Sequence, residues 1–197
     1  MIEIHSVSLE DSSVLKINRS EALRYMGVKE ADLLVNQLVD ECEAEAKAFA
    51  EPRAVYLKTP ISIMDDQIDF GFMRVTSKNL AKNLDGCSCA YVFAATLGIA
   101  IERQFKKISM VSQSKAMVYS AVCSALVESF CDYVNGILAE GHEAKPRFSC
   151  GYGDFCLEHQ KDILNVLEAS KRLGISLTNS YMMVPVKSVT AIIGIRR

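Results

Sequence analysis

The chain has 197 residues, 50% of them hydrophobic, and its 22 basic and 24 acidic side chains give a formal net charge of −2. A chain of this length can bury one sizeable core, so we expect a single domain over residues 1–197. The near-neutral charge provides no broad attraction to phosphate backbones, which argues against a general nucleic-acid-binding role.

The seven cysteines form an odd set without paired spacing, and the first residues lack the basic and apolar regions of a signal peptide. We therefore expect reduced thiols and a cytoplasmic protein. The most apolar stretch near the middle, residues 89–101, is shorter than the roughly 20 apolar residues that a membrane helix needs. We expect no association with a membrane.

Two helices are expected near the N-terminus. Residues 18–26 can form a short helix closed by Gly27, and residues 30–49 continue with apolar positions four residues apart. The acidic side chains between these positions are expected to remain solvated. The inner face of the second helix is expected to comprise Leu34, Leu38, Cys42 and Ala46.

An extended segment is expected beyond Pro52, because apolar residues alternate over residues 55–63. Pro60 cannot donate a hydrogen bond to a neighbouring strand, so we expect this segment to be an edge strand. Asp65-Asp66-Gln67 then predicts a turn into a second short strand over residues 68–72. This hairpin interpretation is favoured over a metal site built from the same aspartates.

The middle of the chain contains the most apolar segments. Thr76 or Ser77 can cap a helix that ends at Leu84. Residues 87–96 predict a buried strand, and a helix to about residue 107 is expected after Gly98. The longest helix is expected over residues 115–138.

The final quarter starts with an irregular, glycine-bearing loop after Pro146. Residues 157–173 predict a helix that Gly174 can close in the left-handed conformation. Strands are expected over residues 180–184 and 188–195. Helices and hairpins are mixed without regular β-α-β alternation, which predicts an α+β fold of long helices packed on a twisted antiparallel β-sheet.

Glu128 is the single charged side chain between residues 116 and 131 of the longest expected helix. An unpaired buried charge costs on the order of several kcal/mol, so this carboxylate must reach water, pair with a cation or contact a ligand. The residues by themselves favour water or an internal arginine.

Arg147 opens a loop in which Gly151 and Gly153 allow backbone geometry that is closed to other residues. Arg147 can clamp a carboxylate with two hydrogen bonds, and Tyr152 can cover a flat or cationic group. The spacing is compatible with a small polar ligand, but also with a glycine-rich turn that carries a stacked tyrosine.

Residues 147–155, Arg-Phe-Ser-Cys-Gly-Tyr-Gly-Asp-Phe, resemble the Arg-x-x-x-Gly-Tyr loop of the reactivation (activation) domain of cobalamin-dependent methionine synthase, where it lines the S-adenosylmethionine pocket. Residues 177–189 are similar to the family's Leu-Thr-Glu-Ser-(aromatic)-x-Met-x-Pro segment, and residues 126–133 resemble its helix with a ligand-contacting glutamate. These matches occur in the family's order and span roughly residues 115–195. The chain therefore looks like a free-standing version of that domain.

The resemblance implies binding of S-adenosylmethionine by a set of loop and helix residues. This set comprises Glu128, Arg147, Phe148, Ser149, Cys150, Gly151 and Tyr152. Glu128 would face the amino group or the sulfonium side of the ligand, and Arg147 would hold its carboxylate or shape the loop. The corrinoid would be faced by Tyr152, Tyr181 and Met183. The protein would need no acid or base, because it would act by orienting the methyl group.

Cobalamin-binding domains of this system carry an Asp-x-His-x-x-Gly signature, which His5, His142 and His159 do not match. The resemblance thus implies that cobalamin is held by a partner, either a corrinoid-binding methionine synthase or a related corrinoid methyltransferase. A flavodoxin- or ferredoxin-type protein would supply the electron. The chain would present the methyl group to reduced cobalamin in support of methionine biosynthesis, as an accessory part of a methyltransferase.

Cys150 and Cys156 stand where the family often has proline, and we interpret them as small apolar fillers. Two other functions remain open. The domain could dock a corrinoid protein without binding S-adenosylmethionine. Alternatively, these two cysteines with Cys87 or Cys89 could form a redox or metal centre, although their spacing matches no known ligand pattern.

Overall fold

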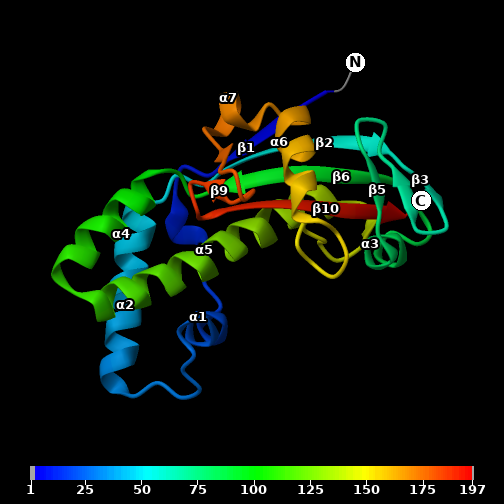
Figure 1. Cartoon of the computed structure of the whole chain (residues 1–197). Coiled ribbons are helices and arrows are strands. Elements are labelled where there is room, and N and C mark those ends of the chain that lie inside the picture. Colours follow the sequence, from blue (N-terminus) through cyan, green and yellow to red (C-terminus); the bar gives the residue numbers. More distant parts are fainter. Residues whose placement is uncertain (1–2, 197) are drawn as a thin grey trace.

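The computed structural model describes residues 3–196 and has the expected α+β architecture (Figure 1). Its main sheet is antiparallel, with the strand order β1-β2-β6-β10-β7. The strands are β1 (His5–Ser8), β2 (Arg53–Pro60), β6 (Cys87–Thr96), β7 (Glu143–Ala144) and β10 (Ser188–Arg196). Helices cover both faces, so side chains on both faces of the central strands are buried.

One face of the sheet packs against a layer of helices. This layer consists of α1 (Arg19–Met26), α2 (Leu33–Phe49), α4 (Ala100–Val111) and α5 (Gln113–Ala139), with the short 3-10 helix η1 (Ser12–Val14) beside them. Phe93 and Ile193 of the sheet share a core with Phe130 and other side chains of α5. By length and composition α5 could cross a membrane, but it packs against the sheet and the other helices of this layer. We identify it as the central core helix.

The opposite face is covered by shorter elements. Val92 and Ile192 pack there against Leu80, Ile163 and other apolar side chains. The helices are α3 (Lys78–Asn83), η2 (Leu157–His159), α6 (Gln160–Val166) and α7 (Ala169–Leu173). A small sheet contains β3 (Ser62–Met64), β4 (Gln67–Asp69) and β5 (Arg74–Thr76), and β8 (Ser176–Leu177) pairs with β9 (Met183–Val184).

Local capping signals predicted several boundaries correctly. The Asn18 side chain accepts a hydrogen bond at the start of α1, and Gly27 ends that helix with a φ of 70°. Ser77 caps α3 in the same way. The α2 prediction was wrong at its start, because Asp32 caps the helix and Leu34 is 74% exposed. The buried face of α2 instead contains Val39, Cys42 and Ala46.

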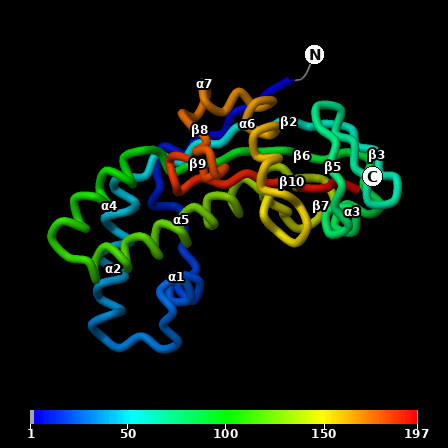
Figure 2. The backbone as a smooth tube through the Cα atoms, viewed as in Figure 1, coloured from blue at the N-terminus to red at the C-terminus, as the bar shows by residue number. Residues whose placement is uncertain are grey.

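The edge-strand prediction for residues 55–63 was also wrong. Strand β2 lies between β1 and β6 (Figure 2). The pairing with β1 extends only from Arg53 to Tyr56, and Pro60 is the last residue of β2. Proline is tolerated because it lies beyond the residues that pair with β1. The turn predicted at Asp65 is confirmed, with Met64 opposite Gln67 in the β3–β4 hairpin.

The helix predicted over residues 157–173 is divided into η2, α6 and α7. The chain breaks at Glu168, whose φ of 50° is left-handed and ends a regular helix. The strand predicted over residues 180–184 shortens to β9, because Tyr181 has a φ of 61°. Strands β1, β5, β7 and β8 were not predicted from the sequence. Their runs of only 4, 3, 2 and 2 residues carry little periodicity.

Gly194 lies where β10 approaches the end of α3. A Cβ atom there would come 2.7 Å from both Cys87 Sγ and Leu84 Cδ2. We therefore expect Gly194→Ala to lower the free energy of unfolding by about 1–3 kcal/mol, the usual effect of overpacking. Gly136→Ala is the matched control, because a Cβ at this exposed position of α5 meets nothing within 4 Å. It should stabilise the protein by about 0.5–1 kcal/mol. Equal urea midpoints for the two variants would contradict this packing.

Candidate functional site

The loop over residues 147–155 is fixed to the rest of the molecule at several points. Phe148 exchanges two backbone hydrogen bonds of 2.9 Å with Ile192 of β10. The loop closes on itself, since Gly151 N donates to Phe155 O at 2.7 Å and Phe155 N donates to Tyr152 O at 3.0 Å. The Phe155 ring is buried and packs against Phe148. The loop is thus a structured turn.

Asp154 joins this loop to the first turn of α3. Its carboxylate accepts hydrogen bonds from the Ser77 hydroxyl, from Lys78 N at 2.8 Å and from Asn79 N at 3.2 Å. The Ser77 hydroxyl, followed by the two backbone amides, lowers the pKa of Asp154 below its ordinary value. Sequence reasoning missed this residue, because its partners lie 75 to 77 positions away.

We expect the stabilising effect of Asp154 to depend on pH. Because its folded-state pKa is lowered, the carboxylate stabilises the fold above the unfolded pKa of about 3.9 and loses this effect as the pH falls below it. Asp154→Ala should therefore lower the melting temperature at pH 7, and the difference from wild type should shrink in acid. Asp85→Ala is a control at another aspartate next to α3. If the difference in melting temperature between wild type and Asp154→Ala does not change with pH, the Asp154 charge does not stabilise the fold.

Arg147 forms an ion-pair network with the central helix α5. Its Nη2 lies 3.1 Å from Glu128 Oε2, and its Nη1 lies 2.9 Å from Asp132 Oδ1. The two acids are four residues apart and therefore share one face of the helix. The prediction that Glu128 meets water or an internal arginine is confirmed, and the arginine is Arg147. The contact between Nη1 and Asp132 is an ion pair without a hydrogen bond, and Nη1 makes no other hydrogen bond within the described residues.

A cleft of about 310 Å³ opens beside this network and is lined by α1, α5 and the loop. We call it the α1–α5 cleft. Its lining residues are Lys16, Asn18, Glu21, Arg24, Tyr25, Ala125, Glu128, Ser129, Asp132, Arg147 and Tyr152. Acidic and basic side chains are equal in number, so the cleft offers partners for both signs of charge. Helix α1, which provides Glu21, Arg24 and Tyr25, packs against α5 (Figure 2).

Two tyrosines give the cleft aromatic surface. Tyr25 is 43% exposed and Tyr152 is 57% exposed. Burial, followed by the nearby Glu128 carboxylate, raises the pKa of Tyr25. The Arg24 guanidinium, which pairs with Glu21, lies 4.7 Å from the centre of the Tyr25 ring. No sequence motif pointed to these α1 residues, and only their packing beside α5 places them at the cleft.

The predicted ligand-binding residues divide into two groups. Glu128, Arg147 and Tyr152 line the α1–α5 cleft together. The remaining residues, Phe148, Ser149, Cys150 and Gly151, shape the loop without lining the cleft. Phe148 and Cys150 pack against the core of the opposite face, and Gly151 turns the chain with a φ of 89°.

The three residues predicted to face a corrinoid do not share a cleft. Tyr152 lies at the α1–α5 cleft, whereas Tyr181 lines a separate hollow of about 450 Å³ beside α6. Met183 is half-buried on β9 and packs against the core of the opposite face. Of these three side chains, only Tyr152 is positioned to contact a ligand in the α1–α5 cleft.

The cysteines show no arrangement for redox or metal chemistry. All seven are free, and burial raises the pKa of Cys150 to about 12, which keeps its thiol protonated. Within residues 3–196, no group of three or more His, Cys, Asp or Glu side chains could hold a metal ion. Cys150 therefore has the properties of a packed apolar side chain. The same interpretation was wrong for Cys156, whose side chain is exposed.

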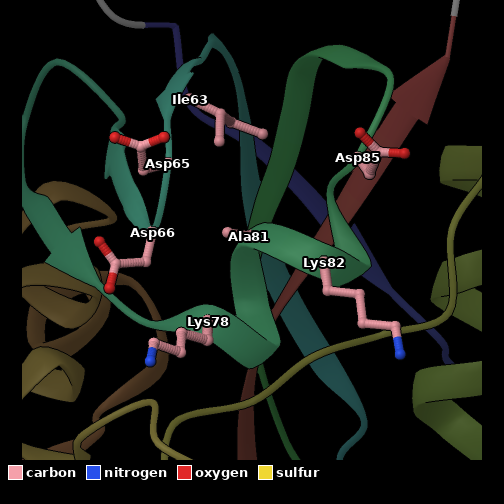
Figure 3. A pocket seen from close by; sticks show the side chains of 7 residues that line it. All are labelled: Ile63, Asp65, Asp66, Lys78, Ala81, Lys82 and Asp85. Atoms are coloured by element: carbon pink, nitrogen blue, oxygen red, sulfur yellow. The ribbon is translucent and has the colours of Figure 1, made fainter.

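Another hollow, of about 680 Å³, lies between the turn of the β3–β4 hairpin and α3 (Figure 3). Asp65 and Asp66 border one side, while Lys78, Lys82 and Asp85 come from α3 and the residues after it. These charged groups are spread around the hollow instead of converging on one point (Figure 3). The hollow therefore lacks the convergent polar groups of a binding site.

No protein-family model and no curated protein matches the sequence. Among solved structures, the chain is similar to one described as the crystal structure of the MetH reactivation domain bound to AdoHcy. The TM-score is 0.76 at 15% sequence identity, and the match covers 98% of this chain and 78% of that chain. This likeness establishes the fold, and it includes the first 110 residues, which the sequence motifs left out.

Proposed function

We propose that the chain binds S-adenosylmethionine in the α1–α5 cleft and presents its methyl group to reduced cobalamin on a separate corrinoid protein. The main support for this proposal is that Glu128, Arg147 and Tyr152 line the same cleft. Glu128 lies on α5, and Arg147, in the loop, follows it by 19 residues in the sequence. The fold that brings them together is similar to that of a reactivation domain bound to AdoHcy.

The charges of the α1–α5 cleft suit this ligand. S-adenosylmethionine carries a carboxylate, an ammonium group and a sulfonium centre. The Arg147 guanidinium lines the cleft and can attract the carboxylate. Glu21 and Glu128 can face the two positive centres, and the exposed ring of Tyr152 can stack on the base or on the sulfonium.

The small volume of the cleft suits a ligand whose methyl group must remain accessible to a second protein. Its volume of about 310 Å³ is at the lower end of the range for small-molecule sites, so a bound nucleoside remains partly exposed. Bound S-adenosylmethionine would supply an electrophilic methyl group to a corrinoid held by the partner. The residues of this chain bind and orient the ligand, and orientation by itself accelerates such a transfer.

Calorimetric titration of the full chain tests the first half of the proposal. We expect saturable binding of S-adenosylmethionine and of S-adenosylhomocysteine at one site, and no binding of homocysteine at the same concentrations. The positive sulfonium should give S-adenosylmethionine the higher affinity, because Glu21, Glu128 and Asp132 all lie at the cleft. A flat titration with both nucleosides contradicts the proposal.

The second part of the proposal, methyl transfer to cobalamin on a separate protein, needs its own experiment. A cobalamin-loaded methionine synthase fragment without its own reactivation domain is mixed with a flavodoxin-type reductant. Methylcobalamin absorbance should appear when this chain and S-adenosylmethionine are both added, and not when either is left out. Nucleoside binding without methylcobalamin formation would support a ligand site and reject this corrinoid partner.

A docking role without S-adenosylmethionine is the second candidate. One observation favours it, because the Arg147 guanidinium is paired with Glu128 and Asp132 of the same chain. In that case the network only rigidifies the surface around Tyr152. Binding of a corrinoid protein together with a flat nucleoside titration would support this candidate.

A further inference from the structure

A second pocket, of about 350 Å³, lies between α4, α5 and the chain that leads into β10. We call it the Lys187 pocket. It is lined by Ile101, Glu102, Phe105, Lys106, Tyr119, Ser120, Cys123, Val186 and Lys187. Apolar side chains such as Ile101, Phe105 and Val186 supply much of the wall, and it shares no residue with the α1–α5 cleft. Small-molecule sites have this composition, with a few polar groups in an apolar wall.

Lys187 places a positive charge in this apolar setting. Its Nζ donates to Ser124 Oγ at 2.7 Å and to Ser120 Oγ at 3.1 Å, and both partners are neutral. Burial lowers the pKa of Lys187. An ammonium group has three donors, so one remains for a further acceptor. The site thus holds a partly desolvated cation that an anion would stabilise.

The hydroxyl of Tyr119 is a second, weakly satisfied polar group. Tyr119 is fully buried and lines the pocket, and its hydroxyl has no nitrogen or oxygen partner within the described residues. Its one polar partner is the Cys123 thiol, which is a weak hydrogen-bonding group. Burial raises the pKa of Tyr119, so the hydroxyl keeps its proton and can donate it. A buried hydroxyl whose partner is only a thiol is weakly satisfied, and a carboxylate would be a stronger acceptor for it.

The charge around the pocket favours an anionic ligand over a cationic one. Lys106 and Lys187 outnumber the single acid, Glu102. The Glu102 carboxylate already accepts a hydrogen bond from Val186 N, so it is partly satisfied by the protein. The free donors, by contrast, belong to Lys187 and Tyr119.

We propose that the Lys187 pocket binds a small monocarboxylic acid with an apolar body. The carboxylate would accept from Lys187 Nζ and the Tyr119 hydroxyl, and the body would pack against Ile101 and Phe105. This site is independent of the proposed nucleoside site. It would let the chain sense or carry an amphipathic acid while the α1–α5 cleft is used for another ligand.

Calorimetry with octanoate and phenylacetate as probes tests the proposal. Both should bind the full chain at one site. Octanol keeps the apolar body but lacks the charge, so it should bind at least about tenfold more weakly, the factor that a charge-assisted hydrogen bond contributes. Acetate has the charge but not the apolar body, so it should also bind at least about tenfold more weakly, because it buries far less apolar surface. Absence of octanoate and phenylacetate binding overturns the proposal, and so does equal affinity for octanoate and octanol.

Two variants separate the ligand from the fold. Tyr119→Phe removes a hydroxyl whose one partner in the protein is the weakly bonding Cys123 thiol, so the melting temperature should stay about equal while octanoate affinity falls about two- to tenfold. Lys187→Met should reduce octanoate affinity at least about tenfold and leave octanol affinity unchanged. Circular dichroism verifies the fold of each variant. A Tyr119→Phe variant that loses stability and keeps full octanoate affinity would assign the hydroxyl to the fold and overturn its role as a donor.

Discussion

Arg147→Ala is expected to weaken S-adenosylmethionine binding by roughly tenfold to hundredfold, the factor associated with losing charged hydrogen bonds. Two effects act in the same direction. The ligand carboxylate loses a positive charge that attracts it, and Glu128 and Asp132 lose the cation that neutralises them. The lone acids then repel the carboxylate of the ligand. Calorimetric titration of wild type and variant measures the difference.

Arg147→Lys keeps the charge without the planar two-armed group, so we expect an intermediate loss of affinity. Arg172→Ala is the matched control, because Arg172 also pairs with a glutamate, Glu168, but lies on α7 away from the α1–α5 cleft. It should bind the nucleoside like wild type. Equal affinities for Arg147→Ala and Arg172→Ala would show that the Arg147 network is only structural.

Phe155→Ala is expected to lower the free energy of unfolding by about 3–5 kcal/mol, the range for removing a buried aromatic ring. Phe155 is 1% exposed and packs against Phe148 and His159 beneath the loop. Its backbone also closes the turn that presents Tyr152. The cavity should therefore loosen the loop and reduce nucleoside affinity as well as stability. Urea unfolding and calorimetry of the same preparation measure both.

Phe155→Leu provides the control, since a large apolar side chain fills most of the space and should destabilise by less than about 1.5 kcal/mol. Its nucleoside affinity should remain close to that of wild type. If Phe155→Ala loses less than about 1 kcal/mol, the ring is not the anchor of the loop. If stability falls and affinity does not, the 147–155 loop does not need this anchor to hold the ligand.

Elements with strong local signals could be predicted from the sequence. The β6 boundaries were predicted correctly because residues 87–96 form one apolar run that ends at Thr96 before a glycine-containing turn. Helix α1 was predicted because Asn18 and Gly27 supply caps at both ends. The fold class followed from the mixture of such elements, and the similarity to the reactivation domain confirms it.

The other features of the fold and of the site depend on contacts between residues far apart in the sequence. Nothing near Glu168 in the sequence indicated that the chain breaks there, and the neighbours of β2 depend on pairing with β1, which lies 45 or more residues earlier. Similarly, the Asp154 carboxylate is held by the start of α3, and the α1 residues reach the cleft through packing against α5. Such contacts leave no short-range pattern, because they are chosen by which apolar faces can be buried together.

The sequence by itself determined that Arg147, Gly151 and Tyr152 belong to one loop and that Glu128 is a solitary charge on an apolar helix. Both facts depend only on residue type and spacing. The tertiary structure decided that Arg147 and Glu128 are partners, 3.1 Å apart, and that α1 completes their cleft. A helix buried in the core must neutralise its charge, but only the packing of distant segments determines which cation does so.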